Sequence, residues 1–501
     1  MRKSVGGYKK RVIATALTVV MGMGVLSGCG DAQDKGNTDS KETSAEASVK
    51  TSGSTVFNGE LEQNVTIQVL ENDTAISKGY FDELIAAFNE AYADYGIVAV
   101  DANMDQYLDL ANDGPYGYGP DVLYQANDII MKYVDGKHVY PIPVEQLDCY
   151  DKIPKEAWDA YQTEVDGTTY TCGVPVNVQT GMLFYRKDLL PEDWQSTWDD
   201  DGNNVPDIVE NWNDMYAFSK KRHEEDASKY GYMKSLYDVY FSSGFLFSYG
   251  AYVFGDNNTN AEDIGLAADE AEKGAWVLSQ LAQVMNEECI DDTITTNAYT
   301  KLADGTYFAT ISTPDVYTTF LDELIQSYEG EGLSEEEARQ KAEENLVMTT
   351  LPKLPKSGDL TEENPELMDT KSMGGVNGYA ISAYTKYPNA CLAFVDFATS
   401  YEMMVERSNM LGIAPAREDA AQKVGGTSEL LYNNLESGNI VLMPSISAVS
   451  QIWTPGQTFF TDLAKDAFRK ESEKKYPDMA AMKKGLEDVS DEIYDAIFTL
   501  K

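Results

Sequence analysis

Gly167-Thr168-Thr169-Tyr170-Thr171-Cys172-Gly173-Val174-Pro175 and Leu183-Phe184-Tyr185-Arg186-Lys187-Asp188-Leu189-Leu190-Pro191 are the two stretches that decide the fold. Shorter stretches accompany them in chain order, at residues 119–122, 304–311, 374–384 and 411–415. Each of these stretches alone is a weak motif. Their order over nearly all of residues 62–470 is hard to obtain by chance, so together they indicate one overall fold.

In this order, the stretches resemble the extracellular solute-binding proteins typified by maltose-binding protein. The resemblance implies an α/β fold of the periplasmic-binding-protein type, in which two discontinuous lobes enclose a ligand cleft. It implies crossovers between the lobes near residues 177–180, 349–351 and 398–401. The lobes are then expected at 62–177 with 351–398 for the first, and at 181–348 with 401–501 for the second.

The apolar pattern by itself also predicts alternating strands and helices. Val65-Thr66-Ile67-Gln68-Val69-Leu70 predicts a strand, and apolar residues from Phe81 to Tyr92 then recur at helical spacing. Further β-rich runs follow at residues 96–100 and 121–124. Because strands and helices alternate, we expect a mainly parallel sheet.

The charge balance excludes one large class of partners. The chain has 501 residues, 39 Lys and Arg against 83 Asp and Glu, and a formal net charge of −44. Nucleic acid is therefore a poor partner on Coulombic grounds. At 43% hydrophobic residues, the sequence can still bury substantial cores.

The N-terminus has the features of an export signal. Five basic residues and an apolar run from Val12 to Leu26 precede Cys29. The run is shorter than the roughly 20 residues that span a bilayer as a helix. Leu26-Ser27-Gly28-Cys29 resembles the lipobox of bacterial lipoproteins, which implies a signal peptide at 1–28 and a lipid on Cys29. A short membrane anchor is the alternative, and the polar residues of 29–61 predict a flexible tether.

Sugars are bound by stacking their C–H faces on aromatic rings and by pairing their hydroxyls with carboxylates and amides. The resemblance places Trp453 at the family's principal stacking position and Tyr240 at another cleft aromatic, with Asp238 beside it. Asp128 and Asp73 fall where the family has hydroxyl-binding carboxylates in the first lobe. The alternative for Trp453 is a ring packed in a core.

Three positions depart from the maltose-binding pattern. Gln125 and Asp315 replace tryptophans of the maltose binders, and Gln179 replaces a glutamate at the first crossover. All three can still hydrogen-bond sugar hydroxyls, so a sugar is expected, with its length and linkage open. For Asp315, a helix N-cap or a surface carboxylate is the alternative.

Asp199 to Glu210 has the spacing of an EF-hand calcium loop. The expected oxygen donors are Asp199, Asp201, Asn203, the carbonyl of Val205, Asp207 and Glu210. Asn204 stands where such loops have glycine, and Asn tolerates the left-handed backbone that the turn requires. The loop therefore predicts a structural Ca²⁺ site, against the alternative of an acidic surface turn.

The sequence has little catalytic machinery. It has two histidines, His138 and His223, and neither a G-x-S-x-G, an H-E-x-x-H nor a C-x-x-C motif. A carboxylate pair would suffice for glycoside hydrolysis, and 83 acidic residues leave that alternative open. Four cysteines besides Cys29 are expected as buried thiols, with a Cys149–Cys172 disulfide as the alternative.

These features predict a monomeric receptor, lipid-anchored on the extracellular face of the membrane. It is expected to close on a carbohydrate, an oligosaccharide of maltodextrin type, and to deliver it to the permease subunits of an ABC importer, without acting as an enzyme. Alternatives are the same fold binding a peptide, polyamine or anion, a secreted glycoside hydrolase, and a calcium-dependent adhesin.

Overall fold

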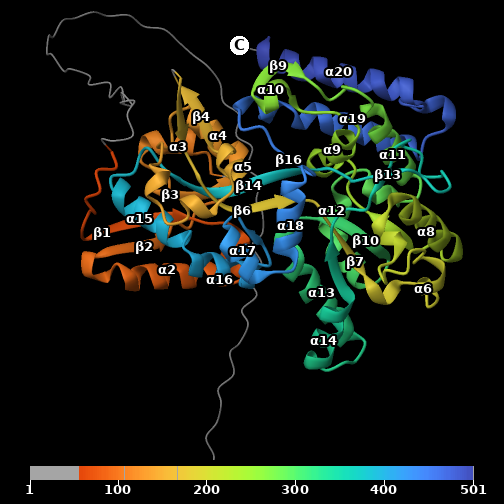
Figure 1. The fold of residues 1–501 in the computed structure, drawn as a ribbon, viewed down its shortest axis with the longest axis horizontal. Helices are drawn as coiled ribbons and strands as arrows, with labels where there is room; N and C mark the ends of the chain where they lie inside the picture. The colour runs from red at the N-terminus through yellow and green to blue at the C-terminus, as the bar shows by residue number, and fades with distance from the viewer. Residues whose placement is uncertain (1–55, 107, 166, 500–501) are drawn as a thin grey trace, which may run out of the picture. The chain divides into compact units, whose positions relative to one another are not determined.

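The structure is a computed structural model that describes residues 56–499 except 107 and 166. The predicted signal peptide, Cys29 and most of the predicted tether lie outside the described residues. The described residues belong to one compact unit within residues 51–501. In this unit, two β-sheets each carry their own helices and their own core (Figure 1).

The first sheet has the strand order β15-β6-β14-β3-β1-β2, and β16 also pairs with β14. Its strands are β1 (Val65–Leu70), β2 (Ile97–Asp101), β3 (Val122–Ala126), β6 (Val174–Thr180), β14 (Ser372–Ile381), β15 (Ala414–Pro415) and β16 (Ile440–Leu442). β1 is parallel to β2 and β3, whereas β14 is antiparallel to β3 and β6.

The second sheet has the order β11-β7-β10-β8. Its strands are β7 (Met182–Arg186), β8 (Tyr230–Met233), β10 (Tyr307–Ser312) and β11 (Leu346–Thr349). β8 and β10 are parallel, and β7 is antiparallel to β10 and β11. Smaller strands are β4 (Gln162–Val165), β5 (Thr168–Thr171), β9 (Asn260–Ile264), β12 (Leu354–Pro355) and β13 (Leu367–Met368).

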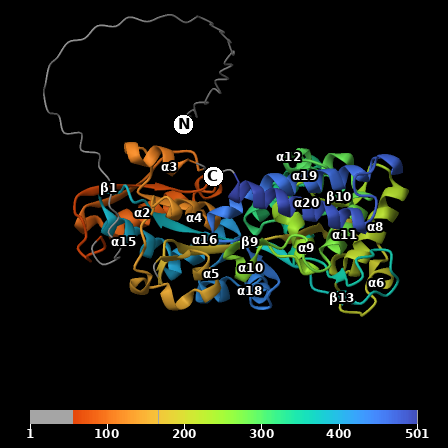
Figure 2. The ribbon, with the colours of Figure 1, turned by 90° about the horizontal axis from the view of Figure 1, so that it is seen from above.

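Helices cover both sheets (Figure 2). Those of the first lobe are α1 (Asp73–Ser77), α2 (Tyr80–Ala91), α3 (Leu110–Asp113), α4 (Asn127–Asp135), α5 (Lys155–Asp159), α15 (Pro388–Ala398), α16 (Tyr401–Leu411) and α17 (Glu418–Val424). Those of the second lobe are α6 (Trp194–Thr197), α7 (Asp207–Glu210), α8 (Trp212–Glu225), α9 (Val239–Ser248), α10 (Gly255–Asn258), α11 (Ala271–Ala282), α12 (Thr293–Ala303), α13 (Tyr317–Gly330), α14 (Glu335–Asn345), α18 (Thr427–Glu436), α19 (Trp453–Asp466) and α20 (Met479–Phe498).

The two lobes have separate hydrophobic cores. Ile67, Phe88 and Val376 belong to the core of the first lobe, and Phe184 and Trp212 belong to that of the second. The sheets are mixed rather than mainly parallel, which corrects the sequence-based expectation. In the first sheet, the cause is that β14, which follows the second crossover, runs antiparallel to β3 and β6.

The chain crosses between the lobes at residues that differ in part from the expected ones. The first crossover is Gly181, between β6 and β7, directly after the expected range. Leu354 and Leu360 pack in the second core, so the second crossover directly precedes β14 and does not lie at 349–351. The chain then stays with the first lobe through α16 and α17, where Leu411 and Ala420 pack in the first core. Leu431 of α18 and Ile440 of β16 pack in the second core, although β16 pairs with β14, so the third crossover follows α17 and does not lie at 398–401.

Packing explains these corrections, because lobe membership follows the buried side chains. Met404 and Leu411 of α16 are 1% exposed within the first core. Phe57, inside the predicted tether, is 7% exposed in the same core. The folded part therefore begins before residue 62.

Other sequence-based expectations are confirmed. β1 has the predicted bounds, and α2 holds most of the predicted helical positions. The four cysteines within the described residues are buried free thiols: Cys149, Cys172, Cys289 and Cys391. Among the helices within the described residues, none is long and apolar enough to cross a membrane.

Candidate functional site

Polar side chains follow the carboxyl ends of parallel strands in both lobes. In the first lobe, Asp73 comes shortly after β1 and Asp128 shortly after β3. In the second lobe, Lys234 directly follows β8, and Asp315 lies in the short 3-10 helix η7 (Pro314–Val316) after β10. Since ligands of α/β proteins bind beyond the carboxyl ends of the strands, these positions mark the candidate site.

Tyr240 lies where the two lobes meet. Its hydroxyl donates to the carbonyl oxygen of Gln179 in the crossover strand β6, at 3.2 Å. Burial raises the pKa of Tyr240, and the carboxylates of Asp315, Asp238 and Asp128 raise it further. Because Asp128 belongs to the first lobe and Asp315 to the second, residues predicted for the cleft from both lobes act on this one hydroxyl.

Asp238 has a local structural task as well. It is the N-cap of α9, and its Oδ1 accepts a hydrogen bond from the backbone N–H of Tyr240 at 3.0 Å. An N-cap carboxylate satisfies one of the free amides at the start of a helix. Asp238 therefore holds Tyr240 in place at the first turn of α9.

Asp315 is neither a surface carboxylate nor a helix cap. Its Oδ1 is buried and has no hydrogen-bond partner among the described residues. Burial raises the pKa of Asp315, and burial also raises the pKa of Asp128, where the backbone N–H of Ile129 opposes the shift. A buried carboxylate oxygen without a partner is costly, and a hydroxyl donor from a ligand would satisfy it.

A loop after β2 connects two of the predicted residues in the first lobe. The backbone N–H of Asp73 donates to Oε1 of Gln106 at 3.3 Å, and Nε2 of Gln125 donates to the carbonyl oxygen of Gln106. Gln125 is 9% exposed. The amide nitrogen of Gln125 thus holds the loop, and Gln106 is a residue of this site that the sequence analysis missed.

Trp453 is the first residue of α19 and is half-buried against the second core. One turn later, Gly456 packs on α9: a Cβ at Gly456 would lie 2.9 Å from Cγ2 of Val239. The first turns of α19 and α9 therefore lie side by side, which brings Trp453 to the helix end that carries Tyr240. The role of Trp453 as a stacking platform stays a prediction.

Lys234, like Gln106, is a residue near the candidate site that was not predicted from the sequence. Burial lowers the pKa of Lys234 to about 8, and nearby Asp238 opposes the shift. Its Nζ lies 3.4 Å from the ring centroid of Phe241, a cation–π distance. The one feature of the sequence that could have indicated Lys234 is its position directly after the strand β8.

The acidic loop at 199–210 folds back on its own backbone. The N–H of Asn204 donates to Oδ2 of Asp199 at 3.2 Å, and Nδ2 of Asn203 donates to Oε1 of Glu210 at 3.0 Å. Asn204 has a φ of +67°, which confirms the predicted left-handed turn. Burial and neighbouring carboxylates raise the pKa of Asp207 and of Glu210.

A cavity of about 450 Å³ lies between this loop and the crossovers. Its lining includes Asp201, Asp207 and Glu210, together with Gly181 and Ser372, and none of the residues predicted for the ligand cleft. In the part of the chain that the structure describes, no three His, Cys, Asp or Glu side chains are grouped to hold a metal ion. Calcium binding by the loop stays a prediction.

Comparisons with known proteins agree with this architecture. The pattern of the bacterial extracellular solute-binding proteins matches residues 83–430. The galactooligosaccharide-binding protein of Bacillus subtilis is 28% identical over 419 residues, which are 79% of this chain and 84% of that protein. The maltodextrin-binding protein MdxE of the same organism is 24% identical over 398 residues, 77% of this chain and 82% of that protein.

Solved structures share the fold. MalX of Streptococcus pneumoniae, in complex with maltopentaose, has a TM-score of 0.65 at 20% identity and covers 86% of this chain and 100% of its own. The maltose-binding protein MalE of Listeria monocytogenes, in complex with maltose, has a TM-score of 0.64 at 21% identity and covers 87% of this chain and 98% of its own. With a family match over most of its length and the same two-lobed fold, this chain belongs to the bacterial extracellular solute-binding proteins.

Proposed function

We propose that this protein is a carbohydrate receptor that closes its two lobes on an oligosaccharide and delivers it to an ABC importer. The observation that carries the proposal is the buried Oδ1 of Asp315, which has no hydrogen-bond partner among the described residues, in the lobe whose Tyr240 bonds the crossover strand β6 of the other lobe. A sugar hydroxyl group can donate the hydrogen bond that Oδ1 of Asp315 does not receive from the described residues.

The ligand class is supported by the relatives. Two of them are named as binding galactooligosaccharides and maltodextrins. Gln125 and Asp315, which stand in place of aromatic residues of the maltose binders, favour an oligosaccharide held by more polar contacts than maltose. We therefore propose a neutral oligosaccharide and expect galactooligosaccharides to compete well with maltodextrins.

The proposed action makes and breaks no covalent bond. A ligand that contacts both lobes stabilises the closed state by its differential affinity for that state. Incubation with galactooligosaccharides and maltodextrins should release no reducing sugar. Release that depends on Asp128 or Asp315 would favour the hydrolase alternative instead.

We further propose that the chain acts as a monomer at the extracellular face of the membrane, anchored by a lipid on Cys29. The lipobox-like sequence supports this, and pneumococcal relatives at 24% identity are named as lipoproteins. Cys29 lies outside the described residues. Metabolic labelling with a fatty-acid analogue, with Cys29→Ala as control, tests the anchor.

We also propose that the loop at 199–210 binds Ca²⁺ as a structural ion. Carboxylate, amide and carbonyl oxygens are the ligands that this hard cation prefers. The EF-hand spacing and the left-handed Asn204 support the proposal.

A thermal-shift screen tests the receptor function. A ligand that binds only the native state stabilises it by mass action and so raises the melting temperature. At a free-ligand concentration of 100 times Kd, the free energy of unfolding rises by about 2.7 kcal/mol. We expect stabilisation by oligosaccharides and none by peptides or polyamines. Stabilisation by a polyamine alone would contradict the proposal.

A further inference from the structure

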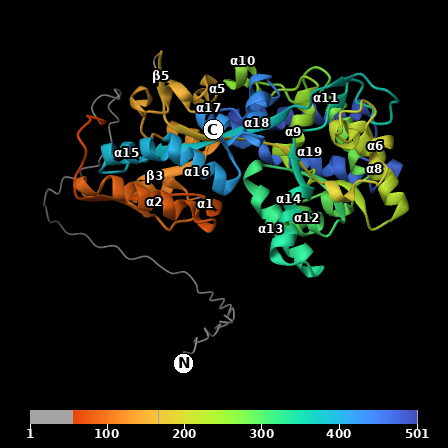
Figure 3. The same cartoon turned by 60° about the horizontal axis from the view of Figure 1, so that its bottom comes forward.

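One ion pair joins the two lobes directly. Nζ of Lys78, the C-cap residue of α1 in the first lobe, lies 2.7 Å from Oδ2 of Asp322 on α13 in the second lobe. The two side chains are 28% and 49% exposed. Figure 3 shows α1 beside α13 where the two lobes approach each other.

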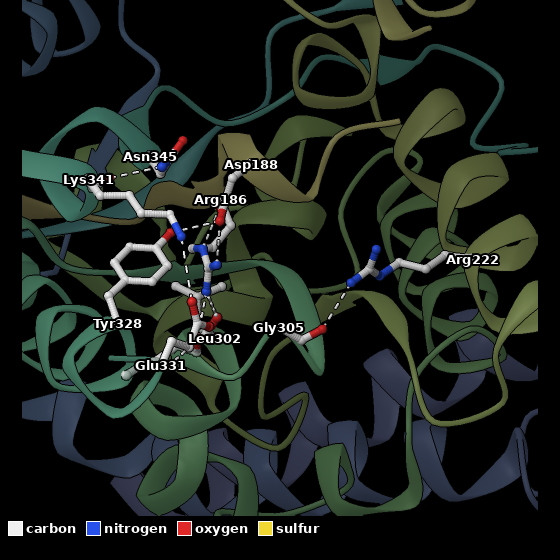
Figure 4. Close-up of polar contacts among 11 residues, drawn as sticks. Arg186, Asp188, Arg222, Leu302, Gly305, Tyr328, Glu331, Lys341 and Asn345 are labelled. Carbon is white, nitrogen blue, oxygen red and sulfur yellow. Dashed lines mark hydrogen bonds and ion pairs between the residues drawn. The ribbon is translucent and has the colours of Figure 1, made fainter. Parts of the chain in front are cut away.

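The second lobe holds α13 firmly (Figure 4). Asp188, after β7, accepts hydrogen bonds at 2.7 Å from Arg186 and from the hydroxyl of Tyr328, which lies near the end of α13. Nζ of Lys341 on α14 lies 3.9 Å from the Tyr328 ring centroid. Arg186 is 4% exposed. The position of Asp322 is therefore set by the framework of the second lobe.

The first lobe holds α1 in the same way. The side chain of Asn72 caps α1 at the N–H of Ala75, at 2.8 Å, and Oε2 of Glu71 accepts from the N–H of Asn72 at 2.8 Å. Glu71 pairs at 2.6 Å with Arg407, and these side chains are 0% and 1% exposed. The position of Lys78 is therefore set by the framework of the first lobe.

A second contact lies next to the ion pair. Gly412, the left-handed C-cap of α16 with a φ of +71°, faces the start of α13: a Cβ there would lie 3.7 Å from Cβ of Tyr317. Two helix ends of the first lobe thus contact α13. The ion pair and this contact can form together only when the lobes are close.

Predicted ligand residues lie at or directly before the helices that form the ion pair. α1 begins with Asp73, and α13 directly follows η7, which holds Asp315. Resting on the receptor function proposed above, we propose that Lys78 and Asp322 form a latch between the lobes. The latch stabilises the closed state and positions Asp73 and Asp315 on opposite sides of the ligand.

The expected size of the effect follows from the exposure of the pair. A partly exposed ion pair contributes modestly, so removing it should shift the closed-to-open ratio by about 2- to 5-fold. The ligand affinity should fall by up to the same factor, since the apparent affinity scales with the fraction of closed protein. Salt should screen the pair, because the Debye length falls from roughly 30 Å at 0.01 M to roughly 3 Å at 1 M.

The test compares Lys78→Gln, Asp322→Asn, their double variant and the charge swap Lys78→Asp with Asp322→Lys. Calorimetric titration with galactotriose at low salt should show a lower affinity for each single variant than for wild type. The double variant should lose no further affinity, and the charge swap should recover it. High salt should weaken wild-type binding to the level of the double variant. Additive losses, or no recovery in the swap, would overturn the latch.

Small-angle scattering of the unliganded protein separates failure of the latch from failure of the receptor function. Lys78→Gln should give a larger radius of gyration than wild type at low salt, whether or not galactotriose binds. Lys483 and Glu272 form a matched control pair within the second lobe, at 3.1 Å and with 30% and 23% exposure. Lys483→Gln should change neither affinity nor radius. Equal radii for wild type and Lys78→Gln would also overturn the latch.

Discussion

Asp315 is expected to destabilise the protein without ligand and to bind the ligand when it is present. Its buried Oδ1 has no partner among the described residues, and burial raises the pKa of its carboxyl group. In the window above the ordinary Asp pKa of about 3.9 and below the raised value, the native state binds more protons than the unfolded state. The contribution of Asp315 to stability therefore decreases as pH rises through this window.

We expect Asp315→Asn to stabilise the empty protein at pH 7 by about 1 kcal/mol, because it removes a buried charge without a full set of partners. The gain should shrink as the pH falls towards 4, because a growing fraction of the wild-type carboxyl group is then protonated. Denaturant unfolding at both pH values measures this. The same variant should lose about 10- to 100-fold in oligosaccharide affinity, the loss expected for a hydrogen bond to a charged group. A destabilised variant with normal affinity would show that Asp315 serves the fold alone.

Trp453 gives a second test at this scale. The ring is half-buried, so Trp453→Ala should destabilise the empty protein by about 1–2 kcal/mol, less than the ~3–5 kcal/mol lost with a core ring. Affinity should fall by roughly 10- to 100-fold if the indole stacks on a sugar. Calorimetry and denaturant unfolding of the variant measure both quantities. A large loss of stability with unchanged affinity would make Trp453 a packing residue.

Single residues were predictable from sequence where a side chain projects from a strand end. Asp128 and Asp315 follow strand ends and Tyr240 lies in the first turn of α9, so element boundaries fix their places, while their joint role in ligand binding stays a prediction. Gln106 and Lys234 were missed, since a lone amide in a loop and a lone lysine after a strand carry no spacing signal. The N-cap role of Asp238 depends on where α9 begins, a boundary that periodicity leaves uncertain by a few residues.

At the scale of elements, the loop at 199–210 carries its own prediction. Burial raises the pKa of Asp207 and Glu210, and neighbouring carboxylates raise it further. If Ca²⁺ binds there, it should relieve the repulsion among these carboxylates. Chelation should then lower the melting temperature by a few degrees, and Glu210→Gln should remove this sensitivity. Differential scanning calorimetry with Ca²⁺ and with chelator measures the effect. Identical melting curves with Ca²⁺ and with chelator would show that the loop is an acidic surface turn that binds no Ca²⁺.

The positions of strands and helices were predicted from the sequence more accurately than the lobe to which each of them belongs. β1 matches its alternation of apolar residues, and α2 matches most of the helical spacing from Phe81 to Tyr92. The later crossovers were misplaced because lobe membership depends on long-range packing, such as that of α16 on the first core. Apolar periodicity reports that a face is buried, but not against which core.

At the scale of the whole molecule, affinity is the sum of ligand contacts and of the contacts that close the lobes. The latch between Lys78 and Asp322 belongs to the second group, and the residues around Tyr240 belong to the first. A ligand must reach both lobes to shift the equilibrium, which is why the carboxylates of opposite lobes are central to the account.

Calorimetric titration of the wild-type protein with galactotriose, maltotriose and spermidine, beside Asp128→Asn and Asp315→Asn variants, tests the central claim most directly. We expect saturable 1:1 binding of at least one of the two trisaccharides, weakened by each substitution, and no binding of spermidine. Binding of spermidine with no binding of either trisaccharide would contradict it.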